Sequence, residues 1–442
     1  MRRLLPLSIA LFGLRFAGSA MAANPHEQII YQFHGGSDGA GPSAGMIADQ
    51  AGNLYGVTGL GGGSAHCAGG CGTVFELSPP AADAAHWTET VLYRFEGGSD
   101  GANPQAPLAM DGAGGLYGTT GSGGDGNCTV IGSAGCGIVF ELVRPSSAAA
   151  GWKESILYSF QGVPGGRGSG DLATPNGLAF DKSGNLLGLA YSGGYCLTDE
   201  TGTYCYGGAY ELRKPSAAGT AWTEKVIYIF PGPTGAPAGP IFASDGDLYG
   251  TVAWGKYGFG EVFKLIPPAP GATGWREVSV FDFNGSDGAF PEPGLAFDKS
   301  ANLFGATLGS PGYGSPYGDV YELTPESGGA SSESLIYDFT PYQNGNTPNG
   351  GIIVGAGGQV YGTAAQGGQG GYGVIYALTP SSPPGGDWSY QMLYGFTGGA
   401  GGSPSYGPAL GLAGALYGTT STGGDMSCGG GAGCGTVFEV VR

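Results

Sequence analysis

Short segments in which apolar and polar residues alternate recur along the chain, and glycine, proline, aspartate or asparagine bound each of them. The clearest copy of this pattern begins at residues 152–160, where every second residue from Trp152 to Phe160 falls on one face of a predicted β-strand. The same copy predicts further strands at residues 177–181, 185–190 and 208–212, with a tight turn between the first two. We expect four antiparallel strands, with residues 177–181 innermost and the tryptophan-led strand outermost.

A longer phrase returns seven times: a strand similar to Asn-Leu-Tyr-Gly-Thr-Thr, a glycine-rich loop, and a strand similar to Gly-Thr-Val-Phe-Glu-Leu. The aromatic position of the first strand, which is once a leucine, lies at Tyr55, Tyr117, Leu187, Tyr249, Phe304, Tyr361 and Tyr417. Successive copies are 62, 70, 62, 55, 57 and 56 residues apart. Repeats of this length are typical of propellers, solenoids and arrays. Because four antiparallel strands per repeat match one propeller blade, the sequence predicts an all-β, seven-bladed β-propeller.

The two ends of the repeat region fit a closed ring. It opens with a segment of the outer-strand type, residues 28–33, and it finishes with a segment of the third-strand type, residues 435–441. We expect these segments to pair, so that the N-terminal strand completes the last blade. On this interpretation residues 24–442 form one repetitive domain.

Charge and composition narrow the classes of function. Residues 1–22 have the features of a signal peptide: Arg2 and Arg3, an apolar stretch too short to span a membrane, and a small-residue cleavage site. Removal of this segment changes the formal charge from −18 to −21. A surface with this much negative charge repels phosphate backbones and anionic lipids. We therefore expect no nucleic-acid partner and no membrane insertion. We expect a monomer that is secreted or periplasmic.

Residues 175–186, Pro-Asn-Gly-Leu-Ala-Phe-Asp-Lys-Ser-Gly-Asn-Leu, resemble the repeat of NHL-type propellers. With the glycine-rich loop and third strand that follow, the repeat resembles more closely the GloVer tandem-repeat family of exported bacterial proteins. The resemblance covers nearly the whole mature chain and implies a β-propeller in the periplasm or outside the cell. It implies no particular biochemical activity. Some copies depart from the pattern, since Leu187 replaces the aromatic residue and Ala301 replaces the turn glycine.

All eight cysteines lie in predicted loops between the second and third strands of a repeat. Their spacing suggests the pairs Cys67 with Cys71, Cys128 with Cys136, Cys196 with Cys205, and Cys428 with Cys434. An even number, close spacing and export predict four local disulfides, whereas a zinc site would need thiols that stay reduced. The pairs fall in repeats one, two, three and seven, which are contiguous in a closed ring. The sequence therefore predicts a reinforced arc on one face.

Candidate binding residues lie in the loops of that face, because loops held by a rigid scaffold are where binding residues concentrate. The candidates are His34, Asp38, His66, Asp100, Asp125, Asp199, Glu200, Trp254, Tyr257 and Asp425. Asp38, Asp100 and Asp287 recur in Ser-Asp-Gly segments and could each offer calcium a carboxylate, but one carboxylate per loop is too few and such segments are typical of turns. Trp254 and Tyr257 are aromatic residues that can stack on a sugar. We expect no metal and no cofactor.

Two functions fit this pattern. The first is a non-catalytic propeller that binds an extracellular glycan or protein through its disulfide-braced loop face. The second is a lyase or glycoside hydrolase that uses the loop carboxylates, or His34 and His66, on a polysaccharide. The sequence contains no nucleophile elbow, phosphate loop or zinc signature. Since the fold alone does not choose between them, we expect binding and keep the enzyme as the alternative.

Overall fold

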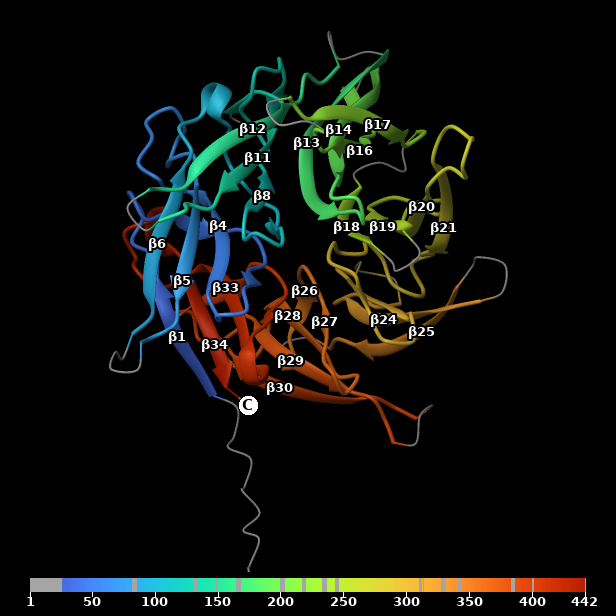
Figure 1. Cartoon of the computed structure of the whole chain (residues 1–442). Coiled ribbons are helices and arrows are strands. Elements are labelled where there is room, and N and C mark those ends of the chain that lie inside the picture. Colours follow the sequence, from blue (N-terminus) through green and yellow to red (C-terminus); the bar gives the residue numbers. More distant parts are fainter. Residues whose placement is uncertain are drawn as a thin grey trace, which may run out of the picture.

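The structure is a computed structural model that describes residues 26–441, except 82–85, 131–132, 148–149, 164–167, 199–202, 217–219, 233–236, 243–245, 310–311, 313, 327–330, 341–342, 383–385 and 400. Seven antiparallel sheets of four or five strands surround a central axis (Figure 1). The expected seven-bladed β-propeller is thus confirmed. The predicted signal peptide, residues 1–22, lies outside the described residues.

Each blade runs from one or two strands at the axis, which are short except for β13 of blade 3, to a strand of seven or eight residues at the rim. Blade 1 contains β2 (Ala40–Pro42), β3 (Ile47–Ala48), β4 (Leu54–Leu60), β5 (Thr73–Ser78) and β6 (Thr88–Arg94). Blade 2 contains β7 (Ala109–Met110), β8 (Leu116–Thr119), β11 (Ile138–Val143) and β12 (Lys153–Ser159). Blade 3 contains β13 (Gly168–Phe180), β14 (Leu186–Thr198), β15 (Thr203–Cys205), β16 (Gly208–Arg213) and β17 (Thr223–Ile229). Blade 4 contains β18 (Ala238–Phe242), β19 (Leu248–Val252), β20 (Glu261–Ile266) and β21 (Arg276–Asp282).

The remaining blades follow the same plan. Blade 5 contains β22 (Ala296–Phe297), β23 (Leu303–Thr307), β24 (Asp319–Pro325) and β25 (Ser331–Asp338). Blade 6 contains β26 (Asn346–Pro348), β27 (Ile353–Val354), β28 (Val360–Gln366), β29 (Val374–Thr379) and β30 (Ser389–Gly395). Blade 7 contains β31 (Gly402–Pro404), β32 (Ala409–Leu410), β33 (Leu416–Thr422), β34 (Thr436–Val441) and β1 (His26–Gln32). Outside the blades, β9 (Thr129–Val130) and β10 (Ser133–Ala134) form a two-stranded sheet within a loop. Other loops contain the 3-10 turns η1 (Gly98–Asp100), η3 (Leu412–Gly414) and η4 (Gly429–Gly431). In the part of the chain that the structure describes, no helix has the length and apolar character needed to cross a membrane.

The N-terminal strand closes the ring. Strand β1 pairs antiparallel with β34, from His26 opposite Val441 to Gln32 opposite Thr436, and the blue and red strands lie side by side in Figure 1. The pairing continues beyond β1, where the Phe33 N–H donates a hydrogen bond to the Gly435 carbonyl at 3.0 Å. The expected closure is confirmed. It also shows that the sequence repeat and the blade are out of phase, because the first strand of each repeat completes the preceding blade; β12, for example, pairs with β11.

A β-bulge in each outer strand corrects one expectation from the sequence. In β12, Tyr158 lies opposite Val139 and Ile156 lies opposite Phe140, so Leu157 is the extra residue. Equivalent shifts occur in the outer strands of all seven blades. The bulge reverses the alternation of faces, and Ile156 is 43% exposed while Leu157 packs into the core. The prediction that every second residue from Trp152 to Phe160 shares one face was therefore wrong. A bulge also increases the local twist, as the rim of a blade requires.

Seven equivalent aromatic pairs join the blades. In each, the phenylalanine after an outer strand meets, edge to face, the aromatic residue of the third strand in the next blade, with ring centroids 4.9 to 5.2 Å apart. The pairs are Phe33–Phe75, Phe95–Phe140, Phe160–Tyr210, Phe230–Phe263, Phe283–Tyr321, Phe339–Tyr376 and Phe396–Phe438. The third-strand ring lies over the repeated second-strand glycine: a Cβ on Gly56 would lie 2.5 Å from the Phe75 ring. The recurring Tyr-Gly sequence is thus a packing requirement.

We call the boundary between two neighbouring blades a seam, and the boundary between blades 7 and 1 the closing seam. Loss of the aromatic pair Phe33–Phe75 at the closing seam is expected to destabilise the whole ring. Replacement of Phe33, which is fully buried, by alanine should lower the free energy of unfolding by about 3–5 kcal/mol, because it removes the ring's burial and leaves a cavity. Chemical denaturation measures this change. The control Ile156→Ala, at an exposed site of another outer strand, should cost less than about 1 kcal/mol. Equal effects of the two substitutions would contradict the proposed importance of the seam.

Acidic pairs also lie at four of the seams. At each, an outer-strand glutamate faces an aspartate that lies before its blade or, for Asp171, in the first strand β13: Glu89 faces Asp38, Glu154 faces Asp100, Glu224 faces Asp171 and Glu333 faces Asp287. Burial, and then the charge of the aspartate, raise the pKa of each glutamate from 4.5 to about 7. The folded protein therefore holds these protons more tightly than the unfolded chain does.

The stability of the fold should consequently depend on pH. The contribution of these groups is fully present below pH 4.5 and is lost as the pH rises toward 7, since their folded pKa values lie above their unfolded value. The free energy of unfolding should fall across this window, and it should fall less steeply in the triple variant Glu89→Gln, Glu154→Gln, Glu224→Gln. Urea titrations at several pH values measure both slopes. Identical slopes would show that the seam glutamates do not carry the pH dependence.

Candidate functional site

A cavity of about 970 Å³ lies among the innermost strands on the propeller axis. This volume is within the range of about 300 to 1,000 Å³ that is usual for small-molecule sites. The side chains with hydrogen-bonding groups that line it are Ser43, Asn103, Gln105, Ser122, Thr174, Asn176, Tyr191, Ser192, Glu292, Asn349, Ser405 and Tyr406. Amides and hydroxyls thus dominate the lining, and of these residues only Glu292 carries a charge.

The repeat builds this ring of polar residues from one recurring position. Each blade enters its inner strand through a proline, and the residue that follows the proline points to the axis at six blades: Ser43, Gln105, Asn176, Glu292, Asn349 and Ser405. The residue before the proline has a positive φ, for example 59° at Asn103 and 56° at Thr174. Its N–H donates to a carbonyl of the preceding blade, which compensates for the strained backbone. The Asn103 N–H bonds to the Cys71 oxygen and the Thr174 N–H to the Cys136 oxygen, both at 2.8 Å.

A glycine of the preceding blade makes room for the proline at the same six blades. At the closing seam a Cβ on Gly435 would lie 2.5 Å from Cδ of Pro42, and at the seam of blades 2 and 3 a Cβ on Gly137 would lie 2.6 Å from Cδ of Pro175. Both glycines also have φ of 90°, which other residues rarely adopt. The glycine that starts each Gly-Thr-Val-Phe-Glu-Leu strand therefore sets how closely the next blade approaches the axis.

The four predicted disulfides are present: Cys67–Cys71, Cys128–Cys136, Cys196–Cys205 and Cys428–Cys434. In three of them the second cysteine directly precedes the seam glycine, and its carbonyl accepts the bond from the next blade's axial segment. In blades 4, 5 and 6 the same acceptors belong to Phe259, Tyr317 and Tyr372 instead. The bridges thus brace the backbone that positions the cavity lining of blades 1, 2 and 3.

Glu292 and Tyr406 lie near each other in this cavity. The Gly350 N–H donates to Oε2 of Glu292 at 3.0 Å, and burial raises the pKa of this carboxyl. Tyr406, from blade 7, reaches toward other blades, because a Cβ on Gly45 would lie 2.7 Å from its ring and one on Gly294 would lie 3.0 Å from its hydroxyl. Burial, together with the Glu292 charge, raises the pKa of Tyr406 far above its usual value, so its hydroxyl stays neutral.

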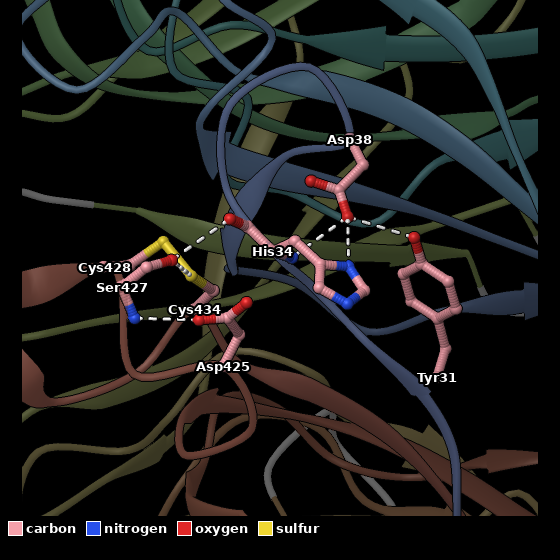
Figure 2. A network of polar contacts seen from close by, with 7 residues as sticks. All are labelled: Tyr31, His34, Asp38, Asp425, Ser427, Cys428 and Cys434. Carbon is pink, nitrogen blue, oxygen red and sulfur yellow. Dashed lines mark hydrogen bonds and ion pairs between the residues drawn. A yellow bond between two sulfur atoms is a disulfide. The ribbon is translucent and has the colours of Figure 1, made fainter.

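The structure brings three sequence candidates together, away from the cavity. Figure 2 shows His34, Asp38 and Asp425 at the seam of blades 7 and 1. Oδ2 of Asp38 accepts bonds from the Tyr31 hydroxyl at 3.0 Å, from the His34 N–H at 3.0 Å and from the His34 ring at 3.2 Å. Asp425 accepts from the N–H of Ser427, whose hydroxyl donates to the His34 carbonyl. These groups bind their own loops together, which assigns Asp38 a structural role.

The other candidates are dispersed. The Asp100 carboxylate repeats the role of Asp38, since it accepts from the Tyr93 hydroxyl and from the Glu96 N–H. His66 contacts Ser64, and the backbone of Asp125 donates to Ser159. Trp254 is 52% exposed and its ring centroid lies 5.9 Å from that of Phe290, two residues before Glu292; Tyr257, 53% exposed, lies under Lys256. Asp199 and Glu200 lie outside the described residues.

None of the eight candidates that the structure describes is among the residues that line the cavity. The axial residues were missed because the sequence analysis assigned them to proline-bearing loops. The sequence feature that could have identified them is the polar residue that follows the proline in most repeats. Among the described residues, no three or more His, Cys, Asp or Glu side chains come together as a metal site.

Fold and cavity together define a seven-bladed β-propeller with a polar axial pocket. The family model described as the Gloeobacter/Verrucomicrobia repeat matches residues 13–196 and 194–438. The chain belongs to this family. No match was found among curated proteins.

Solved structures match the chain only at low sequence identity and low TM-score. A PQQ-bound aldose sugar dehydrogenase from Streptomyces coelicolor is 14% identical, with a TM-score of 0.43 over 96% of this chain and 100% of that one. A protein of unknown function from Dyadobacter fermentans is 11% identical, with a TM-score of 0.43 over 94% and 98% of the two chains. A gluconolactonase from Xanthomonas campestris is 13% identical, with a TM-score of 0.36 over 69% and 78%. With TM-scores this low, none of these likenesses bears on the function of this chain.

The link from disulfide to cavity can be tested by amide hydrogen exchange. Replacement of Cys128 and Cys136 by serine should speed exchange of the Thr174 amide by about tenfold or more, because its acceptor, the Cys136 carbonyl, is no longer braced. The Thr347 amide, which donates to Tyr317 in a loop without a bridge, is the internal control and should change little. Equal acceleration of both amides would mean that the bridge stabilises the fold only globally.

Proposed function

We propose that this protein binds a carbohydrate in its axial cavity, in the periplasm or outside the cell, without chemically changing it. The observation that carries the proposal is the ring of amide and hydroxyl side chains that successive blades direct to the axis. Neutral polar groups of this kind match the alternating donors and acceptors of sugar hydroxyls. A monomer suffices, since one chain supplies the whole ring.

Aromatic side chains beside the polar ring support the same ligand class. Tyr191 lines the cavity and is 54% exposed, and Trp254 stands half-exposed on the neighbouring blade. Apolar ring faces pack against the C–H faces of sugars, while the polar groups bind their hydroxyls.

The disulfide-braced arc supports binding at the same end of the ring. Gly121, Ser122, Tyr191 and Ser192 line the cavity, and each pair leads into a bridged loop, Cys128–Cys136 or Cys196–Cys205. Rigid walls reduce the entropy that binding costs. Four disulfides also fit a compartment more oxidising than the cytosol.

The chemistry of the lining favours binding over hydrolysis. Glycoside hydrolases of the usual kind need two carboxyl groups about 5 to 10 Å apart. Among the described residues that line the cavity, Glu292 is the one carboxyl. A lyase or hydrolase would have to recruit a second acid or base from outside this lining, and the enzyme is therefore the weaker proposal.

A glycan array followed by calorimetry tests the proposal. The double variant Gln105→Ala, Asn176→Ala should bind the best glycan about tenfold or more weakly, because each lost hydrogen bond is worth about 1 kcal/mol. Gln369→Ala, at an exposed site outside the cavity lining, is the matched control and should bind normally. Binding that survives the double variant would place the ligand elsewhere, and release of shorter sugars during the titration would favour the enzyme.

A further inference from the structure

The carboxylate of Glu292 has no positively charged partner in the described part of the chain. The ion pairs there are His34–Asp38, Arg213–Glu211 and Lys264–Asp247. Among the described residues that line the cavity there is no lysine, arginine or histidine. The one hydrogen bond that the structure gives the carboxylate comes from the Gly350 N–H to Oε2.

The side chain of Glu292 is partly buried, and burial raises the pKa of its carboxyl group, because a carboxylate that loses contact with water depends more on hydrogen bonds and on nearby positive charge. One backbone N–H supplies part of this stabilisation. The other oxygen, Oε1, remains for a ligand. The chain as a whole offers no compensation, since its formal charge is −18.

We propose that the carbohydrate bound in the axial cavity is an amino sugar, and that its positively charged amine pairs with Glu292. This inference rests on the proposed function and adds the charge of the ligand to it. A charge-assisted hydrogen bond from an ammonium group to Oε1 supplies the missing partner. The acidic surface attracts the same cation from solution.

Tyr406 completes the site. A Cβ on Gly350, the residue that holds Glu292, would lie 2.8 Å from the Tyr406 ring, so the ring and the carboxylate border the same space. The negative face of an aromatic ring attracts an ammonium group. Its hydroxyl stays neutral and does not repel the carboxylate.

Two trisaccharides whose nitrogens are either charged amines or neutral acetamides test the inference. Calorimetry at pH 6 and low ionic strength, with EDTA to remove divalent cations, should show that the β-1,4-linked trimer of glucosamine binds about tenfold or more tightly than its fully N-acetylated counterpart. Glu292→Gln should abolish this preference, and its thermal unfolding midpoint, measured beside that of the native protein, shows whether the variant is folded. Glu96→Gln removes one charge from an exposed loop and should retain the preference.

Each other outcome overturns a defined part of the account. Equal affinities of the two trimers for the native protein would refute the amine and leave carbohydrate binding intact. A preference that persists in Glu292→Gln but falls in Glu96→Gln would arise from net charge and would equally refute it. If neither trimer binds and the glycan array is also blank, the proposed function itself fails. Should Glu292→Gln not fold, the Gly350 amide resonance of the native protein decides, since the glucosamine trimer should shift it more than the neutral trimer does.

Discussion

The structure depends on one contact that is repeated at every seam: a phenylalanine ring from one blade set edge to face against an aromatic ring of the next, above a glycine with no side chain. This contact fixes the distance between neighbouring sheets. The proline and glycine pair nearer the axis, such as Pro42 and Gly435, fixes the distance of each sheet from the centre. Two spacings repeated around the ring determine the number of blades and the width of the axial space.

The same inner contact connects stability with function. The residue after each of these prolines is polar and points to the axis. The residue before the proline has a positive φ, and its N–H donates a hydrogen bond to a carbonyl of the neighbouring blade. The cavity lining therefore cannot move unless a blade moves. In blades 1, 2 and 7 that carbonyl belongs to a disulfide-bonded cysteine, so the loop bridges also connect to the axial segments.

Much of the fold could be predicted from the sequence, because the same pattern of strands and turns recurs in every repeat. The blades, the closure by β1 and the four bridges all follow from periodicity and spacing. The bulge at Leu157 could not be predicted, since a bulge keeps the residue types of a regular strand and changes only their register. The roles of Asp38 and Asp100 were also hidden, because one hydrogen-bond donor to each belongs to a tyrosine on the preceding outer strand.

The axial site could not be predicted for a different reason. Gln105, Asn176 and Glu292 are far apart in the sequence, and each stands alone in a proline-bearing segment. They become a site only when seven blades close at a particular radius. A crystal structure of the protein with a bound oligosaccharide tests this account most directly. We predict ligand density in the axial cavity, in contact with Gln105 and Asn176, whereas a ligand seated on the outer loops around His34 and Asp425, with an empty axis, would contradict it.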